Sequence, residues 1–130
     1  MIEIKDETEK VILVGVALSD QDDTKESLEE LKDLVSTAGA ETAGMLIQNR
    51  EQQHPATYVG KGKIEELKNM IWELRATGIV CDDELSPAQM KNLQDELDVK
   101  VMDRTLIILD IFAARASTSE GKIQVELAQL

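Results

Sequence analysis

Aromatic side chains are scarce in this chain, with Phe112, Trp72 and Tyr58 accounting for 2% of its residues. Platforms for stacking nucleic-acid bases are therefore few, and the interior is expected to consist of Leu, Ile, Val, Met and Ala. The 130 residues are 42% hydrophobic, which is enough to bury one core but not two full domains. We therefore expect one compact unit with an aliphatic interior.

Basic residues and cysteine are also few. The formal net charge of -12 repels phosphate backbones, so broad non-specific binding to nucleic acid is excluded and any RNA contact must be local. Acidic residues outnumber basic ones about two to one from Met1 to Lys100, whereas the two signs nearly balance from Val101 onward. Electrostatic repulsion of RNA is therefore expected to be weakest in the stretch from Val101 onward.

Secretory and membrane signals are missing from the sequence. Cys81 is the single cysteine and cannot form an internal disulfide, which suits a reducing compartment. The segment from Met1 to Lys10 has neither the basic start nor the apolar run of a secretory signal, and no apolar run approaches membrane-spanning length. These features predict a soluble, cytoplasmic protein.

Apolar runs typical of buried strands alternate along the chain with stretches that have helical periodicity. Amphipathic helices are expected between the first and second runs, after Gly60, and after Ser86. The expected strands cover 11–18, 42–48, 79–81 and 99–102, and a short extended piece is expected at 57–60. This order predicts an α/β fold, a three-layer sandwich with a mainly parallel sheet between helices.

Local signals predict where the helices begin and end. A capping box of the form Asp-x-x-Glu starts at Asp23, and Gly39 supplies a left-handed stop for the first helix. The second helix is expected to close at Gly78. Ser86-Pro87-Ala88-Gln89 combines an N-cap serine, a proline at the first helical position and a reciprocal capping glutamine.

The pattern changes near Arg104, where we place the boundary between an α/β subdomain, residues 1–103, and the first part of a helical subdomain, residues 104–130. Leu106 to Ala116 is apolar and helical, and a polar break follows it. A further apolar stripe then runs to the end of the chain at Leu130. Because a helix without a packing partner is marginal in water, we expect the chain to be part of a longer protein.

One candidate site for a phosphate is the segment Gly60, Lys61, Gly62 and Lys63, which opens a helix with free backbone N–H groups and two lysines. It lacks the G-x-x-x-x-G-K-[ST] spacing, and no Ser or Thr follows Lys63 to ligate magnesium, so it is not a Walker motif. The alternative is a glycine-rich turn with solvated lysines.

A second candidate lies in the acids that follow two of the strands. Asp82-Asp83-Glu84, joined by Asp20, Asp22 and Asp23, could bind magnesium as in a phospho-receiver module. A receiver should also carry a lysine after its last strand, where this chain has Asp103-Arg104-Thr105. The alternative is a set of solvated strand-end acids. No catalytic residue and no metal site is predicted, because His54 and Cys81 have no ligand partners at suitable spacing.

A third candidate is the basic and polar C-terminal part. An exposed polar loop between helices can enter a confined RNA cavity, using arginine forks and backbone donors. The alternative is an ordinary interhelical loop. The candidates for contact with ribosomal RNA are Arg104, Arg115, Ser117, Thr118, Ser119 and Lys122.

Four segments in this order resemble the signature segments of the HflX family of ribosome-associated GTPases, whose N-terminal domain the chain is similar to. They are Ala56 to Leu67, Asp82 to Gln89, Asp103 to Ala113, and Glu120 to Leu130. The resemblance implies an α/β subdomain followed by a long helical pair and then a GTPase domain, before which this chain ends. That domain would use GTP and Mg²⁺, whereas no cofactor and no enzyme activity is expected in this fragment.

The same resemblance implies partners and a role. The expected partners are the large ribosomal subunit with its rRNA and the protein's own downstream GTPase domain. GTP state would then control ribosome splitting or rescue under stress. The resemblance points to Arg104, Arg115 and the segment 117–122 for RNA contact, and to Gly60 to Lys63 for a nucleotide. A nucleotide-binding α/β domain and a receiver-like signalling module stay open as alternatives.

Overall fold

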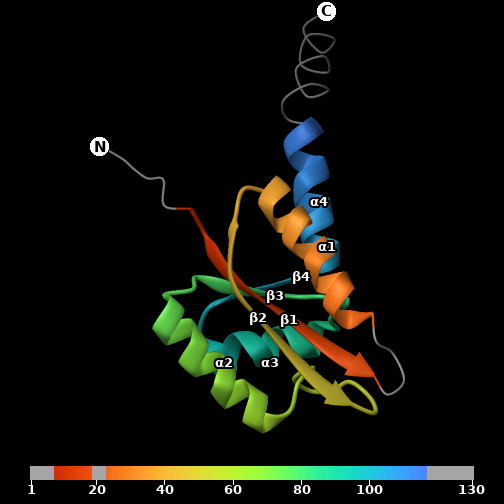
Figure 1. Cartoon of the computed structure of the whole chain (residues 1–130), viewed down its shortest axis with the longest axis vertical. Coiled ribbons are helices and arrows are strands. Elements are labelled where there is room, and N and C mark those ends of the chain that lie inside the picture. The colour runs from red at the N-terminus through yellow and green to blue at the C-terminus, as the bar shows by residue number, and fades with distance from the viewer. Residues whose placement is uncertain (1–7, 19–22, 117–130) are drawn as a thin grey trace, which may run out of the picture.

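The computed structural model describes residues 8–18 and 23–116 of the chain, in which strands and helices alternate. The strands are β1 (Lys10–Leu18), β2 (Glu41–Arg50), β3 (Gly78–Cys81) and β4 (Lys100–Asp103). The helices are α1 (Thr24–Thr37), α2 (Lys61–Leu74), α3 (Pro87–Leu97) and α4 (Arg104–Arg115). Figure 1 shows their arrangement.

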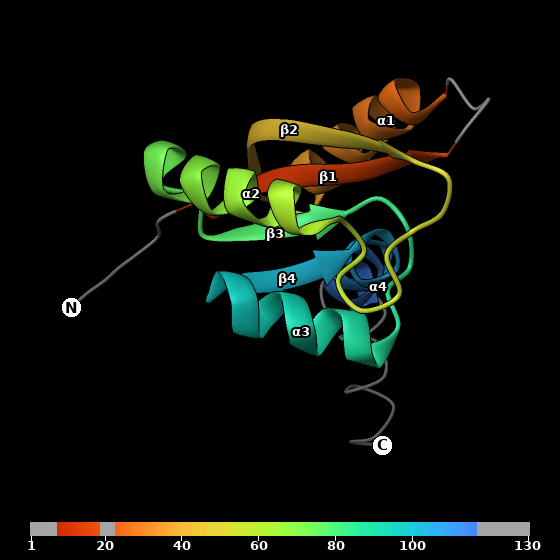
Figure 2. The ribbon, with the colours of Figure 1, turned by 90° about the horizontal axis from the view of Figure 1, so that it is seen from below.

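The four strands form one sheet in the order β2-β1-β3-β4, and every pairing in it is parallel. Figure 2 shows this order from one edge of the sheet to the other. Because β2 and β3 lie on opposite sides of β1, the chain changes direction across the sheet there, as in doubly wound α/β folds. The four carboxyl ends of the strands lie at the same edge, which is where such folds bind ligands.

Helices cover both faces of the sheet, and each face has its own hydrophobic core. On one face, α2 and α3 bury Ile64, Leu67 and Leu93 against β1 and β3. On the other, α1 and the first turns of α4 bury Leu28, Leu31, Val35 and Ile107. The predicted three-layer α/β sandwich with a parallel sheet is confirmed.

The interior is not purely aliphatic, which corrects the expectation from composition. Tyr58 is fully buried in the core beside α2 and α3, and it is among the largest side chains with no exposure. The other two aromatic residues are on the surface, with Trp72 of α2 84% exposed and Phe112 of α4 60% exposed. Tyr58 is tolerated inside because its hydroxyl has a hydrogen-bond acceptor.

Some of the predicted helix ends are confirmed and others are wrong. Gly39 has a φ of 96° just past α1, as a left-handed stop requires, and Ser86 and Gln89 form the predicted capping box at α3. Asp23 is the N-cap of α1, but its side chain makes no capping hydrogen bond. Helix α2 ends before Arg75, which adopts the left-handed conformation itself, so Gly78 is not the stop and instead begins β3.

The segment 57–60 is not the predicted extended piece, because Thr57 completes a tight turn at residues 55–57. His54 and Tyr58 flank this turn and pair in both directions, with N to O distances of 3.1 and 2.9 Å. Tyr58 has a φ of 69°, in the left-handed region that non-glycine residues rarely adopt. Such backbone strain persists only where surrounding contacts fix it, and those contacts come from α3 and from the loop after β3.

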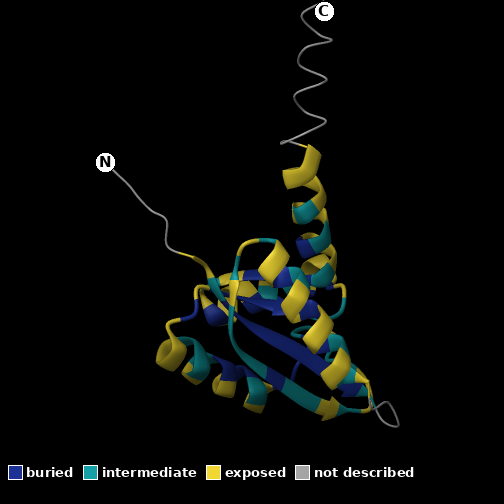
Figure 3. Ribbon diagram, turned by 45° about the horizontal axis from the view of Figure 1, so that its top comes forward, coloured by how far each residue is buried: buried dark blue, intermediate teal, exposed yellow. Residues whose placement is uncertain are grey.

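Helix α4 begins directly after β4, at the residue where the sequence pattern changes. Ile107 is its one fully buried side chain, whereas Leu106, Leu109 and Phe112 are 40%, 56% and 60% exposed. Figure 3 shows the far end of α4 as exposed. Residues 117–130, including the predicted polar break and last stripe, lie outside the described residues, so the boundary at 103/104 stays a prediction. Within the described part, none of the helices is long and apolar enough to span a bilayer.

Candidate functional site

The segments that follow β2, β3 and β4 meet at the carboxyl edge of the sheet. There they are joined by side-chain hydrogen bonds between residues that are far apart in the sequence. We call this set the carboxyl-edge network, and it consists of His54, Tyr58, Asp82, Asp83, Gln89, Asp103 and Arg104. Three of the four segments that resemble the HflX signature contribute residues to this network.

The turn after β2 is held from both inside and outside. Inside the turn, His54 Nδ1 accepts hydrogen bonds from the backbone N–H groups of Ala56 and Thr57, at 3.1 and 3.3 Å. From α3, Gln89 donates to the His54 carbonyl at 2.9 Å and Asn92 donates to the Ala56 carbonyl at 3.0 Å. His54 therefore stabilises the turn, and its Nδ1 atom is occupied by the two hydrogen bonds within the turn.

The Tyr58 hydroxyl connects this turn to the loop after β3. It donates to Asp83 Oδ2 at 2.6 Å, the short distance typical of an O–H bonded to a carboxylate. Burial of the ring, and next the hydrogen bond to Asp83, raise the pKa of Tyr58 far above its ordinary value of 10.0. The phenol therefore stays protonated and serves as a donor.

Asp82 is paired with Arg104 rather than solvated. Nη2 of Arg104 lies 2.8 Å from Asp82 Oδ1, and the same nitrogen donates to Ser27 of α1, at 2.9 Å to the carbonyl and 3.0 Å to Oγ. The Asp82 side chain is 9% exposed and that of Arg104 is 25% exposed. The alternative of solvated strand-end acids is therefore wrong for Asp82.

Asp103 joins the last strand, the loop after β3 and the last helix. Its Oδ1 accepts from the Leu106 N–H as the N-cap of α4, and its Oδ2 accepts from the Leu85 N–H, both at 2.9 Å. Asp103 is 3% exposed, so its charge is stabilised mainly by these donors and by the start of α4. The carboxylate has a structural task at this position.

The acids do not form a metal site with other ligands in the described residues, where no group of three or more His, Cys, Asp or Glu side chains could hold an ion. Asp20 and Asp22 lie outside the described residues, and Asp23 is an exposed N-cap. Cys81 is fully buried as predicted, and burial together with the nearby Asp103 carboxylate raises the pKa of its thiol. A protonated, enclosed thiol is a poor nucleophile.

The Gly60–Lys63 segment starts α2, as the sequence predicted. The Gly60 N–H donates to Gln48 Oε1 at 2.8 Å, and Lys63 pairs with Glu66 at 2.9 Å. Gly62 and Lys61 are exposed at the first turn. A cavity of about 540 Å³ opens beside this turn, lined by His54, Ala56, Thr57, Lys61, Ile64, Glu65 and Glu96.

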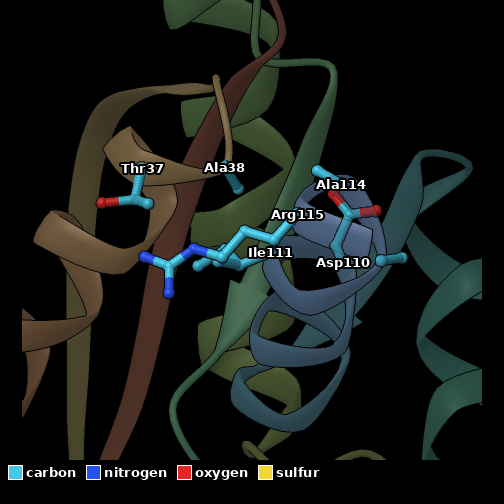
Figure 4. Close-up of a pocket in the computed structure, with 7 residues that line it drawn as sticks. Thr37, Ala38, Asp110, Ile111, Ala114 and Arg115 are labelled. Carbon is cyan, nitrogen blue, oxygen red and sulfur yellow. The ribbon is translucent and has the colours of Figure 1, made fainter. Parts of the chain in front are cut away.

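The structure places the two described RNA-contact candidates differently from one another. Arg104 is engaged in the carboxyl-edge network, whereas Arg115 is at the far end of α4. Figure 4 shows the Arg115 side chain extending across a groove of about 470 Å³ toward Thr37 at the end of α1. Ser117, Thr118, Ser119 and Lys122 lie outside the described residues. RNA contact by all six residues stays a prediction.

Comparison with known proteins identifies the family. A profile described as GTP-binding GTPase N-terminal matches residues 25–113, which is more than half of the chain and includes the whole carboxyl-edge network. The chain belongs to this family. The resemblance to HflX N-terminal domains is confirmed by relatives named GTPase HflX, one from Lacrimispora saccharolytica being 67% identical over 130 residues. Another, from Escherichia coli, is 43% identical over 130 residues.

The chain spans only about a third of these relatives, 31% of the Lacrimispora protein and 30% of the Escherichia coli protein, although both alignments cover 100% of this chain. Solved structures agree with the fold. A GDP complex of SsGBP matches with a TM-score of 0.66 and 26% identity, over 94% of this chain and 34% of that one. A GDP-bound GTP-binding protein from Sulfolobus solfataricus matches with a TM-score of 0.61 and 25% identity, over 92% and 35%.

Several residues of the carboxyl-edge network were not singled out from the sequence. Tyr58, Asp103 and Gln89 looked like parts of a strand, a loop and a helix cap, and only the fold brings their partners close. One signal was present, because all three lie in the HflX signature segments. In this chain, part of the segments that resemble the signature therefore holds the domain together.

Proposed function

We propose that this chain is the ribosome-docking part of an HflX-type GTPase, acting in the cytoplasm to position a downstream GTPase domain on the large ribosomal subunit. The main support is the position of α4. Its first turn is capped by Asp103 and packed against the sheet, whereas its last turns are exposed and precede the segment with the RNA-contact candidates. A rigid sandwich with one projecting helix is suited to presenting that segment in a confined RNA cavity.

Electrostatics support a narrow rather than a broad contact. The net charge of -12 repels rRNA phosphates, so an RNA contact requires a local set of basic groups. Arg115 and Lys122, both near the end of the chain, are the groups proposed for that contact, whereas Arg104 acts within the domain. Binding by this chain alone is expected to be weak, because few cations are available to release counterions from RNA.

We also propose that this chain does not hydrolyse GTP. The Gly60–Lys63 segment lacks the hydroxyl that a Walker motif supplies to magnesium, and Lys63 is paired with Glu66. Hydrolysis, with its GTP and Mg²⁺, would belong to the remaining part of the longer protein. A role in splitting or rescuing ribosomes under stress would follow from coupling that hydrolysis to docking.

Pelleting with purified large ribosomal subunits tests the docking proposal. The full-length protein carrying this domain should pellet, and the variant Arg115→Ala with Lys122→Ala should pellet less. A matched variant, Lys91→Ala with Lys68→Ala, removes the same charge from α3 and α2 and should leave pelleting unchanged. Equal pelleting by all three proteins would contradict the proposed RNA contacts, and no pelleting by the unaltered protein would contradict docking itself.

Nucleotide binding at the start of α2 is a second candidate function, favoured by the cavity of about 540 Å³ beside Lys61. A phosphate could there accept from the first N–H groups of α2. Labelled ATP and GTP would be titrated against the chain and its Lys61→Ala/Lys63→Ala variant, with Lys91→Ala as the control. Loss of affinity in the first variant alone would support this site, and equal affinity in all three would exclude it.

A further inference from the structure

Apolar burial alone holds α4 weakly to the sandwich. Ile107 is 2% exposed, and Ile108 and Ile111 are half-buried, but Leu106, Leu109 and Phe112 are exposed. One buried turn fixes where a helix starts better than where it points, because dispersion contacts have little directional preference. The direction of α4 must therefore depend on other contacts.

The first residue of α4, Arg104, makes several directional contacts with other elements. The Arg104 guanidinium reaches Asp82 through two nitrogens, with Nε at 3.2 Å and Nη2 at 2.8 Å, and also reaches Ser27. These partners belong to two different elements, the loop after β3 and the first turns of α1. A planar guanidinium with several bonds at set angles fixes orientation in a way that a single contact does not.

We infer that Arg104 is a positioning residue that fixes the direction in which α4 leaves the sheet. Asp103 caps the same helix and fixes its starting point, and Arg104 holds its first turn against both the loop after β3 and α1. Because Nε and Nη2 of Arg104 are bonded to Asp82 and Ser27, we assign its role to positioning α4. This inference does not depend on ribosome docking.

Distance measurements between spin labels test the inference in this chain. Labels at Phe112→Cys on α4 and Asn69→Cys on α2 report the direction of α4, in a Cys81→Ala background. A reference pair, Asn69→Cys with Gln94→Cys, reports the packing of α2 against α3. Arg104→Ala should shift the mean α4 distance and abolish its single narrow peak, and the reference pair should keep its distribution.

Two further variants separate orientation from charge. Arg104→Lys keeps the cation but loses the fork, so its α4 distance distribution should lie between those of the unaltered chain and Arg104→Ala. Asp82→Ala should broaden the distribution, and adding Arg104→Ala to it should broaden it little more. An Arg104→Ala distribution that superimposes on that of the unaltered chain would overturn the inference. Equal broadening of the reference pair would overturn it as well, because Arg104 would then hold the whole sandwich.

Discussion

Tyr58 and Asp83 are joined by a hydrogen bond of 2.6 Å that links the turn after β2 to the loop after β3. Tyr58 has a left-handed backbone at a φ of 69°, and its ring is fully buried. A strained turn is thus fixed by one polar contact and by packing. Because the two segments are 25 residues apart, this contact stabilises tertiary structure rather than local structure.

Removing only the hydroxyl measures that contact. Tyr58→Phe keeps the ring but leaves Asp83 without its donor, and the free energy of unfolding should fall by about 1–2 kcal/mol. Urea denaturation followed by circular dichroism would measure the change. Trp72→Phe, at a position 84% exposed, is the control and should stay within about 0.5 kcal/mol of the unaltered chain. Equal effects of the two substitutions would contradict the structural role of the hydroxyl.

Alkaline pH should destabilise the fold through Cys81. Burial raises the pKa of its thiol above the ordinary value of 9.0, so the folded chain keeps a proton that the unfolded chain loses. The contribution of this thiol to the free energy of unfolding is fully present below pH 9. Above pH 9 the free energy of unfolding declines, by at most about 1.4 kcal/mol per pH unit for one group. Unfolding free energies measured between pH 8 and pH 10 should fall less steeply for Cys81→Ala. Parallel curves for the two proteins would be the contrary result.

Two glycines should respond oppositely to replacement by alanine. A Cβ at Gly78 would lie 2.7 Å from the backbone oxygen of Lys100, so Gly78→Ala should cost about 1–3 kcal/mol by pushing β3 and β4 apart. A Cβ at Gly62 would meet nothing within 4 Å, and Gly62→Ala should stabilise α2 by about 0.5–1 kcal/mol. Thermal unfolding of both variants checks the signs, and a neutral Gly78→Ala would refute the close approach.

Gln89 has two tasks that one substitution separates. Gln89→Glu keeps the oxygen that accepts from the Ser86 N–H, but it loses the donor to the His54 carbonyl. The α3 cap should survive, whereas the turn after β2 should open more often. Amide hydrogen exchange should therefore speed up at Tyr58, whose N–H bonds to His54, and stay unchanged at Met90 in α3. Faster exchange at both residues would show that the cap is lost too.

The layers and the parallel sheet could be predicted because apolar periodicity is a local property. The apolar run at β1 and the apolar stripes of α1 and α3 indicate which faces are buried. The spacing of the buried residues then predicts whether the segment is a strand or a helix. Helix ends were harder to predict. Gly78 resembled a helix stop, but its lack of a side chain instead allows β3 to lie close to the backbone of Lys100 in β4. The left-handed residue that ends α2 is Arg75.

The carboxyl-edge network could not be derived from spacing. Arg104 and Ser27 are 77 residues apart, and Tyr58 and Asp83 are 25 residues apart, so only the folded sheet brings these partners together. A charged residue near a strand end has the same appearance in the sequence whether it is solvated, binds RNA or pairs internally. The resemblance to HflX identified the important segments, and the geometry assigns Asp82 and Asp103 to holding the fold.

Trp72, the single tryptophan, has a solvent-exposed side chain on α2. Its fluorescence should therefore change little when the chain unfolds, which makes emission a poor reporter of stability for this protein. The same exposure makes the indole a natural sensor of contact, because any molecule that covers α2 would remove the ring from water and shift its emission to shorter wavelength. Docking on that side could then be followed without attaching a dye.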